Sequence, residues 1–574
     1  MTHREFDVLV ALCRPIVGDA PFTEPASIRR IAEELVVSEA AVKQHILHLY
    51  DKFELNDEHE NRRVRLANAA LECGVVTAAD LGGEPGMRTR GSRSAPIDLG
   101  PAREEARIGE WDGAYGGFSA VDIDTLEPAD LELLGHAAFW SEHPDASIAA
   151  RQRAHAAYLV RGDPAGASRV ALDLSLNHIS RLRLAVAAGW FETARRLLGP
   201  IPEGREHAQL AAVAALFAIA AGGFDTALVE TERGLDLGRR HGDRDSVALC
   251  LTYRGYALVH LGRGSEGLAL LDEAMALAMS GQVGTFATDQ AFCRTLGACV
   301  ERWDFRRAAE WTDALLAGGG PRTIGTGGDC LTHRVAVDIV RGEWRRGAAA
   351  AETACLETEG FDLNHVATAL AGLGEIHLRR GDLELADAAF RRAHTLGGSV
   401  AGGMARLLFE RGDVVEAANM IDAALRDATS SPLFRAGLLP VAVDIALARD
   451  DVERARAASG ELAATADATA TEALRAAAAH AVGSVALADG DAMVAETAFR
   501  ASYRAWQDVG APYEAAHARV GLGRAMLLGG SPGSARLEFD AAGAVFERLG
   551  AARDVERVAR LANPGRDPSL AART

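Results

Sequence analysis

A stretch of about twenty residues recurs along this chain, and it constrains the fold more than any other feature. The four copies that match best begin at Gly255, Gly374, Gly483 and Gly523. Each has a second glycine seven residues after the first, a small residue five further on, and Phe or Leu four further still. The last three copies read Gly-x6-Gly-x4-Ala-x3-Phe without a gap. Copies of this kind indicate an array of stacked structural units.

The spacing within a copy predicts a hairpin of two helices. The first glycine would let the two helices approach closely, and the second would lie at the turn, where a left-handed backbone costs glycine little. The Ala and the Phe would share one face of the second helix and fill the space against the first helix. One such hairpin cannot bury its apolar face alone, so neighbouring hairpins must stack.

Looser copies extend the array in steps of about 40 residues. Their turns are expected near Gly162, Gly189, Gly222, Trp303, Gly342, Gly412 and Asp450. Apolar residues make up 48% of the chain but aromatic residues only 6%, which favours helices packed through Ala and Leu over a sheet. We therefore expect an all-α chain in which residues 111–562 form an α-solenoid.

These units resemble the tetratricopeptide repeat. In one copy, the positions that match the small and aromatic packing residues of that family are Gly374, Gly381, Ala386, Phe390 and Ala393. The resemblance covers most of residues 111–562. Steps near 40 residues exceed the roughly 34 of that family, and its usual Trp and Pro are mostly missing. Longer helices or loops and an irregular superhelical curvature are therefore expected.

The first 76 residues carry a different pattern. Thr2 and Glu5 form a capping box, and the stretch "IAEELVVSEAAVKQHI" indicates a short helix, a turn and a longer helix that opens at Ser38. This segment resembles the helix-turn-helix domains of the LuxR/GerE type, with or without a wing. The loop between Leu12 and Ile28 is longer than in that family, and the domain comes first in the chain instead of last.

The resemblance implies that the second helix of this motif enters the major groove of DNA. With Val42, Ile46 and Leu49 turned inward, the residues expected to face DNA are Ser38, Ala40, Lys43, Gln44, His45, His48, Lys52, Arg62 and Arg63. Lys43 can donate to guanine and Gln44 can pair with adenine. Taken singly, each of these side chains could equally be an ordinary solvated residue.

The charge of the chain limits how this domain would bind DNA. Residues 1–76 hold nine Lys or Arg and thirteen Asp or Glu, a net charge of −4 within a chain of −19. Affinity for phosphates rises steeply with the number of cationic contacts, so one domain should bind weakly. Two copies on paired half-sites would bind more tightly through effective concentration. We therefore expect a homodimer on double-stranded DNA.

Residues 77–110 are rich in Gly, Pro, Ser and Arg and lack apolar periodicity, which predicts a flexible linker. Residues 563–574 are expected to be a disordered tail. No run of about 18 uncharged apolar residues occurs, and acidic residues stand where a signal peptide would be basic. Seven scattered cysteines without a Cys-x-x-Cys pair are typical of reduced thiols. These features predict a cytoplasmic protein without a membrane partner.

The chain contains no phosphate loop, no His-x-x-Glu-His metal motif and no Gly-x-Ser-x-Gly elbow. We therefore expect no enzyme activity, cofactor or metal. An aromatic-rich region between Gly281 and Arg334 suggests a ligand pocket, whose candidate members are Gln290, Arg294, Trp303 and His333. The alternative is that these aromatic residues belong to the repeat core.

Together these patterns predict a transcriptional regulator. Residues 1–76 would read DNA, and the array would sense a peptide, small molecule or protein, or would bring two DNA-reading domains together. Subtracting −4 for residues 1–76 and −1 for the linker leaves −14 for the array, which argues against DNA binding there. The alternative is an interaction scaffold of the tetratricopeptide type in which residues 1–76 are a docking module.

Overall fold

The computed structural model describes residues 3–13, 28–35, 39–52, 66–67, 70, 98–317, 327–358, 362–428 and 431–562. The chain divides into two compact units, Met1–Ile97 and Asp98–Thr574. Every regular element within the described ranges is a helix, which confirms the predicted all-α class. Among these helices, none is both long enough and apolar enough to cross a membrane.

In the first unit, three helices pack against one another: α1 (His3–Cys13), α2 (Ile28–Leu35) and α3 (Glu39–Lys52). Their shared core contains Leu9 and Leu12 of α1 and Ile31 of α2, all with no exposed surface. From α3, the predicted inward residues Val42, Ile46 and Leu49 are all buried in this core. The apolar stripe of α3 thus packs as its helical spacing predicts.

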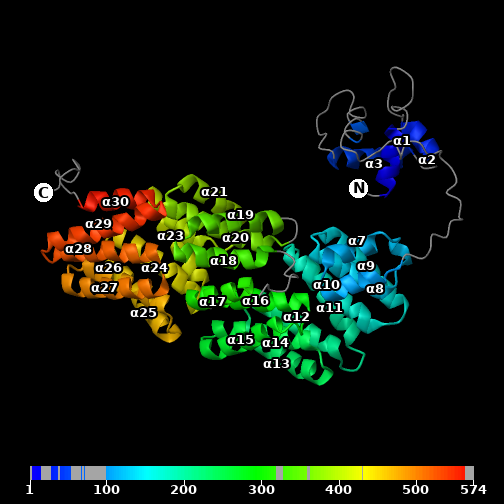
Figure 1. Cartoon of the computed structure of the whole chain (residues 1–574), viewed down its shortest axis with the longest axis horizontal. Helices are drawn as coiled ribbons and strands as arrows, with labels where there is room; N and C mark the ends of the chain where they lie inside the picture. The colour runs from blue at the N-terminus through cyan, green and yellow to red at the C-terminus, as the bar shows by residue number, and fades with distance from the viewer. Residues whose placement is uncertain are drawn as a thin grey trace, which may run out of the picture. The chain divides into compact units, whose positions relative to one another are not determined.

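The second unit is a succession of helical hairpins, in which consecutive helices lie antiparallel (Figure 1). The first helices are α6 (Gly100–Ile108), α7 (Trp111–Ser119), the 3-10 helix η2 (Ile123–Thr125), α8 (Pro128–Trp140), α9 (Pro144–Val160), α10 (Pro164–Ser180), α11 (Leu184–Leu198), α12 (Arg205–Ala220) and α13 (Phe224–His241). The middle helices are α14 (Arg244–His260), α15 (Gly264–Met279), α16 (Thr285–Glu301), α17 (Phe305–Ala317), α18 (Gly327–Arg341), α19 (Trp344–Thr358), α20 (Leu363–Arg380) and α21 (Leu383–Thr395). The last helices are α22 (Ala401–Arg411), α23 (Val414–Asp427), α24 (Pro432–Ala448), α25 (Val452–Thr469), α26 (Glu472–Ala488), α27 (Ala492–Val509), α28 (Pro512–Leu528), α29 (Pro532–Leu549) and α30 (Ala552–Ala562).

The helical array begins earlier than the sequence pattern indicates. Helix α6 lies inside the segment 77–110 that was predicted to be a linker. Ala102 and Ala106, four residues apart, are buried on one face of this helix, and Arg103 pairs with Asp130 of α8 at 2.8 Å. The buried stripe of α6 consists of only two alanines, so it does not stand out within a segment that otherwise has the composition of a linker.

The repeat signature has the geometry that its spacing predicts. A methyl group added at Gly374 of α20 would lie 2.6 Å from the ring of Phe390 in α21, so the glycine lets the ring pack directly on the first helix. The equivalent pairs are Gly483 with Phe499, Gly523 with Phe539, and Gly255 with Leu271. The second glycines lie at turns and have a left-handed backbone, with φ between +77° and +91° at Gly262, Gly381, Gly490 and Gly530.

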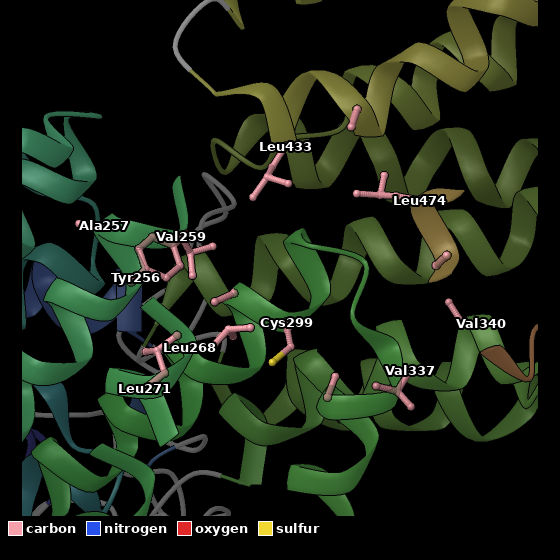
Figure 2. Close-up of a cluster of buried hydrophobic side chains, with 14 of the residues drawn as sticks. Tyr256, Ala257, Val259, Leu268, Leu271, Cys299, Val337, Val340, Leu433 and Leu474 are labelled. Carbon is pink, nitrogen blue, oxygen red and sulfur yellow. The ribbon is translucent and has the colours of Figure 1, made fainter. Parts of the chain in front are cut away.

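Helices α14–α18 and helices α24–α28 are far apart in sequence, and the two stretches contact each other within this unit. One buried cluster joins both stretches and includes Val259, Val340, Leu433 and Leu474 (Figure 2). At the turn after α16, Arg302 donates from Nη2 to the Thr469 carbonyl oxygen at 3.0 Å. The Thr471 hydroxyl in turn donates to the Arg302 carbonyl oxygen, also at 3.0 Å. Such contacts go beyond the nearest-neighbour packing of a simple solenoid.

Candidate functional site

The first helices of four successive hairpins, α14, α16, α18 and α20, lie side by side, and polar side chains collect where they meet. The members are Tyr253 and Tyr256 of α14, Gln290, Cys293 and Arg294 of α16, His333 of α18 and His365 of α20; we call them the α16 cluster. Gln290, Cys293 and Arg294 share one face of α16 because they are three and four residues apart. All three are half-buried.

Cys293 lies between two imidazole rings. Its sulfur is 3.5 Å from Nε2 of His333 and 3.8 Å from Nε2 of His365. The other ring nitrogen of His365, Nδ1, is 3.2 Å from the Asp362 carboxylate. Asp362 is the N-cap of α20 and accepts the backbone N–H groups of Asn364 and His365, so the capping residue also positions a charge behind the imidazole.

The two histidines change the acidity of the Cys293 thiol. Burial by itself raises its pKa, but the hydrogen bonds and positive charges of His333 and His365 outweigh burial and hold the pKa well below the usual range of a thiol. Cys250 and Cys299 lack this pairing, and burial raises the pKa of each to about 12.

Aromatic and amide groups border the cysteine on the α14 side. The Tyr253 hydroxyl donates to Oε1 of Gln290 at 3.1 Å. The Arg294 guanidinium lies over the ring of Tyr256, 5.4 Å from its centre, in a cation–π contact. Nε of Arg294 is buried and finds no hydrogen-bond partner among the described residues. A ligand oxygen would satisfy this N–H donor.

Three of the four residues predicted for a ligand pocket, Gln290, Arg294 and His333, belong to the α16 cluster. Trp303 lies elsewhere, at the turn after α16, where its backbone has φ 59° and its ring centre is 6.4 Å from that of Trp506. It contributes to the contact between the two distant stretches of the array. Sequence reasoning missed Cys293, although its place on the same helical face as Gln290 and Arg294 was a usable signal.

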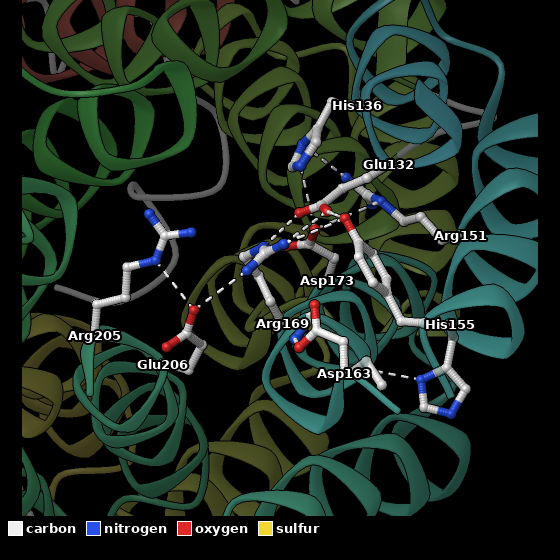
Figure 3. A network of polar contacts seen from close by, with 12 residues as sticks. Glu132, His136, Arg151, His155, Asp163, Arg169, Asp173, Arg205 and Glu206 are labelled. Atoms are coloured by element: carbon white, nitrogen blue, oxygen red, sulfur yellow. Dashed lines mark hydrogen bonds and ion pairs between the residues drawn. The ribbon is translucent and has the colours of Figure 1, made fainter. Parts of the chain in front are cut away.

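A second polar network lies nearer the start of the array, on α8, α9 and α10 (Figure 3). Glu132, His136 and Asp173 are close enough together to ligate a cation. However, Arg169 pairs with Glu132 at 2.6 Å, and Arg151 lies 3.9 Å from Asp173 with only 4% of its side chain exposed. The two arginines already supply the positive charge that a cation would bring, so this network holds helices together.

The structure describes only part of the predicted DNA-reading surface. Lys43 and Lys52 of α3 are exposed, and His45 is half-buried. The side chains of Ala40, Gln44 and His48, and the whole of Ser38, Arg62 and Arg63, lie outside the described residues. The expected contacts of these residues with DNA therefore stay predictions.

No family model matches the chain, and no curated protein matches it. Among solved structures, the chain is similar to the Cut9–Hcn1 hetero-tetramer of APC/C, with 11% identity over 80% of this chain and 95% of that chain and a TM-score of 0.35. NprR in complex with its cognate peptide NprX has 15% identity over 59% and 98% and a TM-score of 0.42. A tetratricopeptide repeat protein from Parabacteroides merdae has 15% identity over 46% and 93% and a TM-score of 0.30. All three scores are below 0.5, and the array is described by its own geometry, an α-solenoid of tetratricopeptide-like helical hairpins.

Proposed function

We propose that this chain is a DNA-binding transcriptional regulator whose helical array senses a ligand or partner, dimerises the DNA-reading units, or does both. The observation that carries the proposal is the packing of α3. This helix buries Val42, Ile46 and Leu49 against α1 and α2 and leaves Lys43 and Lys52 exposed. A recognition helix needs this division, because its buried face fixes the helix while its exposed face meets the major groove.

The charge of the first unit supports a dimeric arrangement. With a net charge of −4 over residues 1–76, a single unit has few cations to offer the phosphates. Two units on adjacent half-sites would add their contacts, so affinity would depend on both half-sites being present.

Selection from a random double-stranded library with the full-length protein tests the proposal. The selected DNA should bind less tightly as the salt concentration rises, measured by fluorescence anisotropy. Lys43→Ala should weaken specific binding by about 1–3 kcal/mol if Lys43 contacts a base edge. The matched control is Arg306→Ala on α17, where 85% of the side chain is exposed, and this variant should bind as the parent does. Failure to enrich any sequence, or equal binding by Lys43→Ala and the parent, would refute the proposal.

The α16 cluster favours a second candidate function, an interaction scaffold that binds a peptide or protein through the array. The unpaired Nε of Arg294 and the half-buried Gln290 are groups that a partner's carboxylate or backbone could satisfy. A scaffold would pull down the same partner from cell extract whether or not Lys43 is intact, and it would lose that partner on Arg294→Ala.

A further inference from the structure

The arrangement of protons around Cys293 is set by its neighbours. A thiol carries one proton and can donate it to one imidazole only, yet two Nε2 atoms lie within 3.8 Å of the sulfur. The Asp362 carboxylate at 3.2 Å favours a proton on Nδ1 of His365, so Nε2 of the neutral ring can accept the proton of Cys293. His333 can then donate its Nε2–H to the sulfur.

We propose that Cys293 is a nucleophilic thiolate that forms covalent adducts with α,β-unsaturated carbonyl compounds at the α16 cluster. The thiol proton passes to Nε2 of His365, and the carboxylate of Asp362 stabilises the resulting imidazolium. The cysteine next to a histidine, with an aspartate behind the histidine, is the arrangement by which a neighbouring base activates a thiol. The proposal is independent of DNA binding, because it concerns the array alone.

The addition needs no co-reactant. The Cys293 sulfur forms a bond with the β-carbon of the acceptor, and the electron pair of the carbon–carbon double bond moves to the α-carbon. That carbon takes the proton that His365 received from the thiol, so no electron or leaving group is lost. The carbonyl oxygen gains negative charge during the addition, and the unpaired Nε–H of Arg294, one residue along α16, is the donor available to it.

The charged and titratable groups around Cys293 are consistent with a thiolate. They are Arg294 on the same helix, Tyr253, Tyr256 and Asp289 beside it, His333 on α18, and Asp362 and His365 at the start of α20. Burial raises the pKa of Tyr253 and Tyr256, so neither adds a negative charge at neutral pH. Asp272 of α15 and Asp304 of the turn before α17 act on the charge of Cys299, which points about 120° away from Cys293 around α16.

Labelling of the intact protein with N-ethylmaleimide, followed by peptide mass spectrometry, measures the rate at each cysteine. At pH 6 a thiolate of low pKa is about a hundredfold more populated than an ordinary thiol but about tenfold less nucleophilic, a net gain of about tenfold. We expect Cys293 to label at least about tenfold faster than a free model thiol at pH 6, with Cys299 slower than either.

Two variants test the role of the imidazole. Asp362→Asn keeps a good helix cap and removes only the charge behind His365, so it should slow labelling of Cys293 at pH 6 and move the midpoint of its pH profile upward. His365→Gln should do so more strongly. His241→Gln, an exposed histidine at the end of α13, is the control and should label as the parent does. Circular dichroism melting confirms that each variant is folded.

Three results would overturn the proposal. The first is a Cys293 rate that rises with pH around the usual thiol pKa of about 8.5. The second is a folded Asp362→Asn and a folded His365→Gln that both label as fast as the parent. The third is slow labelling that speeds up only after a metal chelator is added, which would assign the cluster to a bound soft metal ion instead.

Discussion

The Phe390 ring is held between two glycines, and this predicts a measurable cost for adding one methyl group. Gly374 of α20 lies on one side of the ring, and Gly403 of α22 lies on the other; an added Cβ would be 2.6 Å from ring atoms at either position. Carbon atoms attract each other best at about 3.5–4.0 Å, so Gly374→Ala overlaps the ring by about 1 Å. The ring cannot retreat, because Gly403 already contacts it.

The magnitude follows from two opposing effects. Overpacking of this kind costs about 1–3 kcal/mol, whereas replacing Gly by Ala inside a helix gains about 1 kcal/mol. Gly460 of α25 separates the two effects, because a methyl group there meets nothing within 4 Å. Gly460→Ala should therefore stabilise its helix, and Gly374→Ala should be less stable than Gly460→Ala by about 1–3 kcal/mol.

Hydrogen exchange of the backbone amides is the suitable assay, because a long array need not unfold in one step. Amide exchange in α20 and α21 measures the effect of Gly374→Ala on local stability, and amide exchange in α25 measures the effect of Gly460→Ala, each relative to the parent. The double variant Gly374→Ala/Phe390→Leu replaces the ring by a smaller side chain and should recover part of the lost stability, with a coupling free energy of about 1 kcal/mol between the two positions. If the two glycine variants change the protection of their own helices by the same amount, the close approach of glycine and ring is not what packs the hairpins.

Two further predictions concern basic side chains inside the array. Burial and the nearby Arg557 hold the pKa of His517 well below its usual range. The unfolded chain therefore binds a proton that the folded chain does not bind, and stability should fall as pH drops below about 6.5. His517→Gln should flatten the fall in Tm between pH 7 and pH 5, whereas His241→Gln should retain the parent's slope; equal slopes would contradict this cause. Arg302→Met removes the donor to the half-buried Thr469 carbonyl and should lower protection of the amides at the start of α26 by about 1–3 kcal/mol. Arg306→Ala, on the exposed face of α17, should leave the same amides unchanged, and an Arg302→Met variant with parental protection would show that the hydrogen bond is dispensable.

The parts of the structure that the sequence predicted well are those set by local spacing. The pairing of Gly374 with Phe390 joins two neighbouring helices, and the two partners are only sixteen residues apart in sequence. The inward direction of Val42, Ile46 and Leu49 follows from the period of a single helix. In each case the physical cause, close packing or amphipathicity, acts within one hairpin or one helix.

What the sequence did not predict depends on partners that are distant in the chain. His365 reaches Cys293 across 72 residues, and no spacing rule relates a residue of α16 to one of α20. The ring of Trp303 lies near Phe305, its neighbour in sequence, but also near Trp506, which belongs to another part of the array and which no local pattern relates to it. Helix α6 was missed because Gly, Pro and Arg dominate the composition around Ala102 and Ala106.

The hydrogen bonds between Arg302 and the turn at Thr469–Thr471 fix the number of hairpins that separate them. In a solenoid with contacts only between neighbours, a unit can be inserted or deleted and the ends simply move apart or together. Here an extra hairpin between α17 and α25 would carry Thr469 out of reach of Arg302 and would separate Leu433 and Leu474 from Val259 and Val340. The repeat count of this segment is therefore a property that selection on stability can hold constant, even where the individual repeats diverge in sequence.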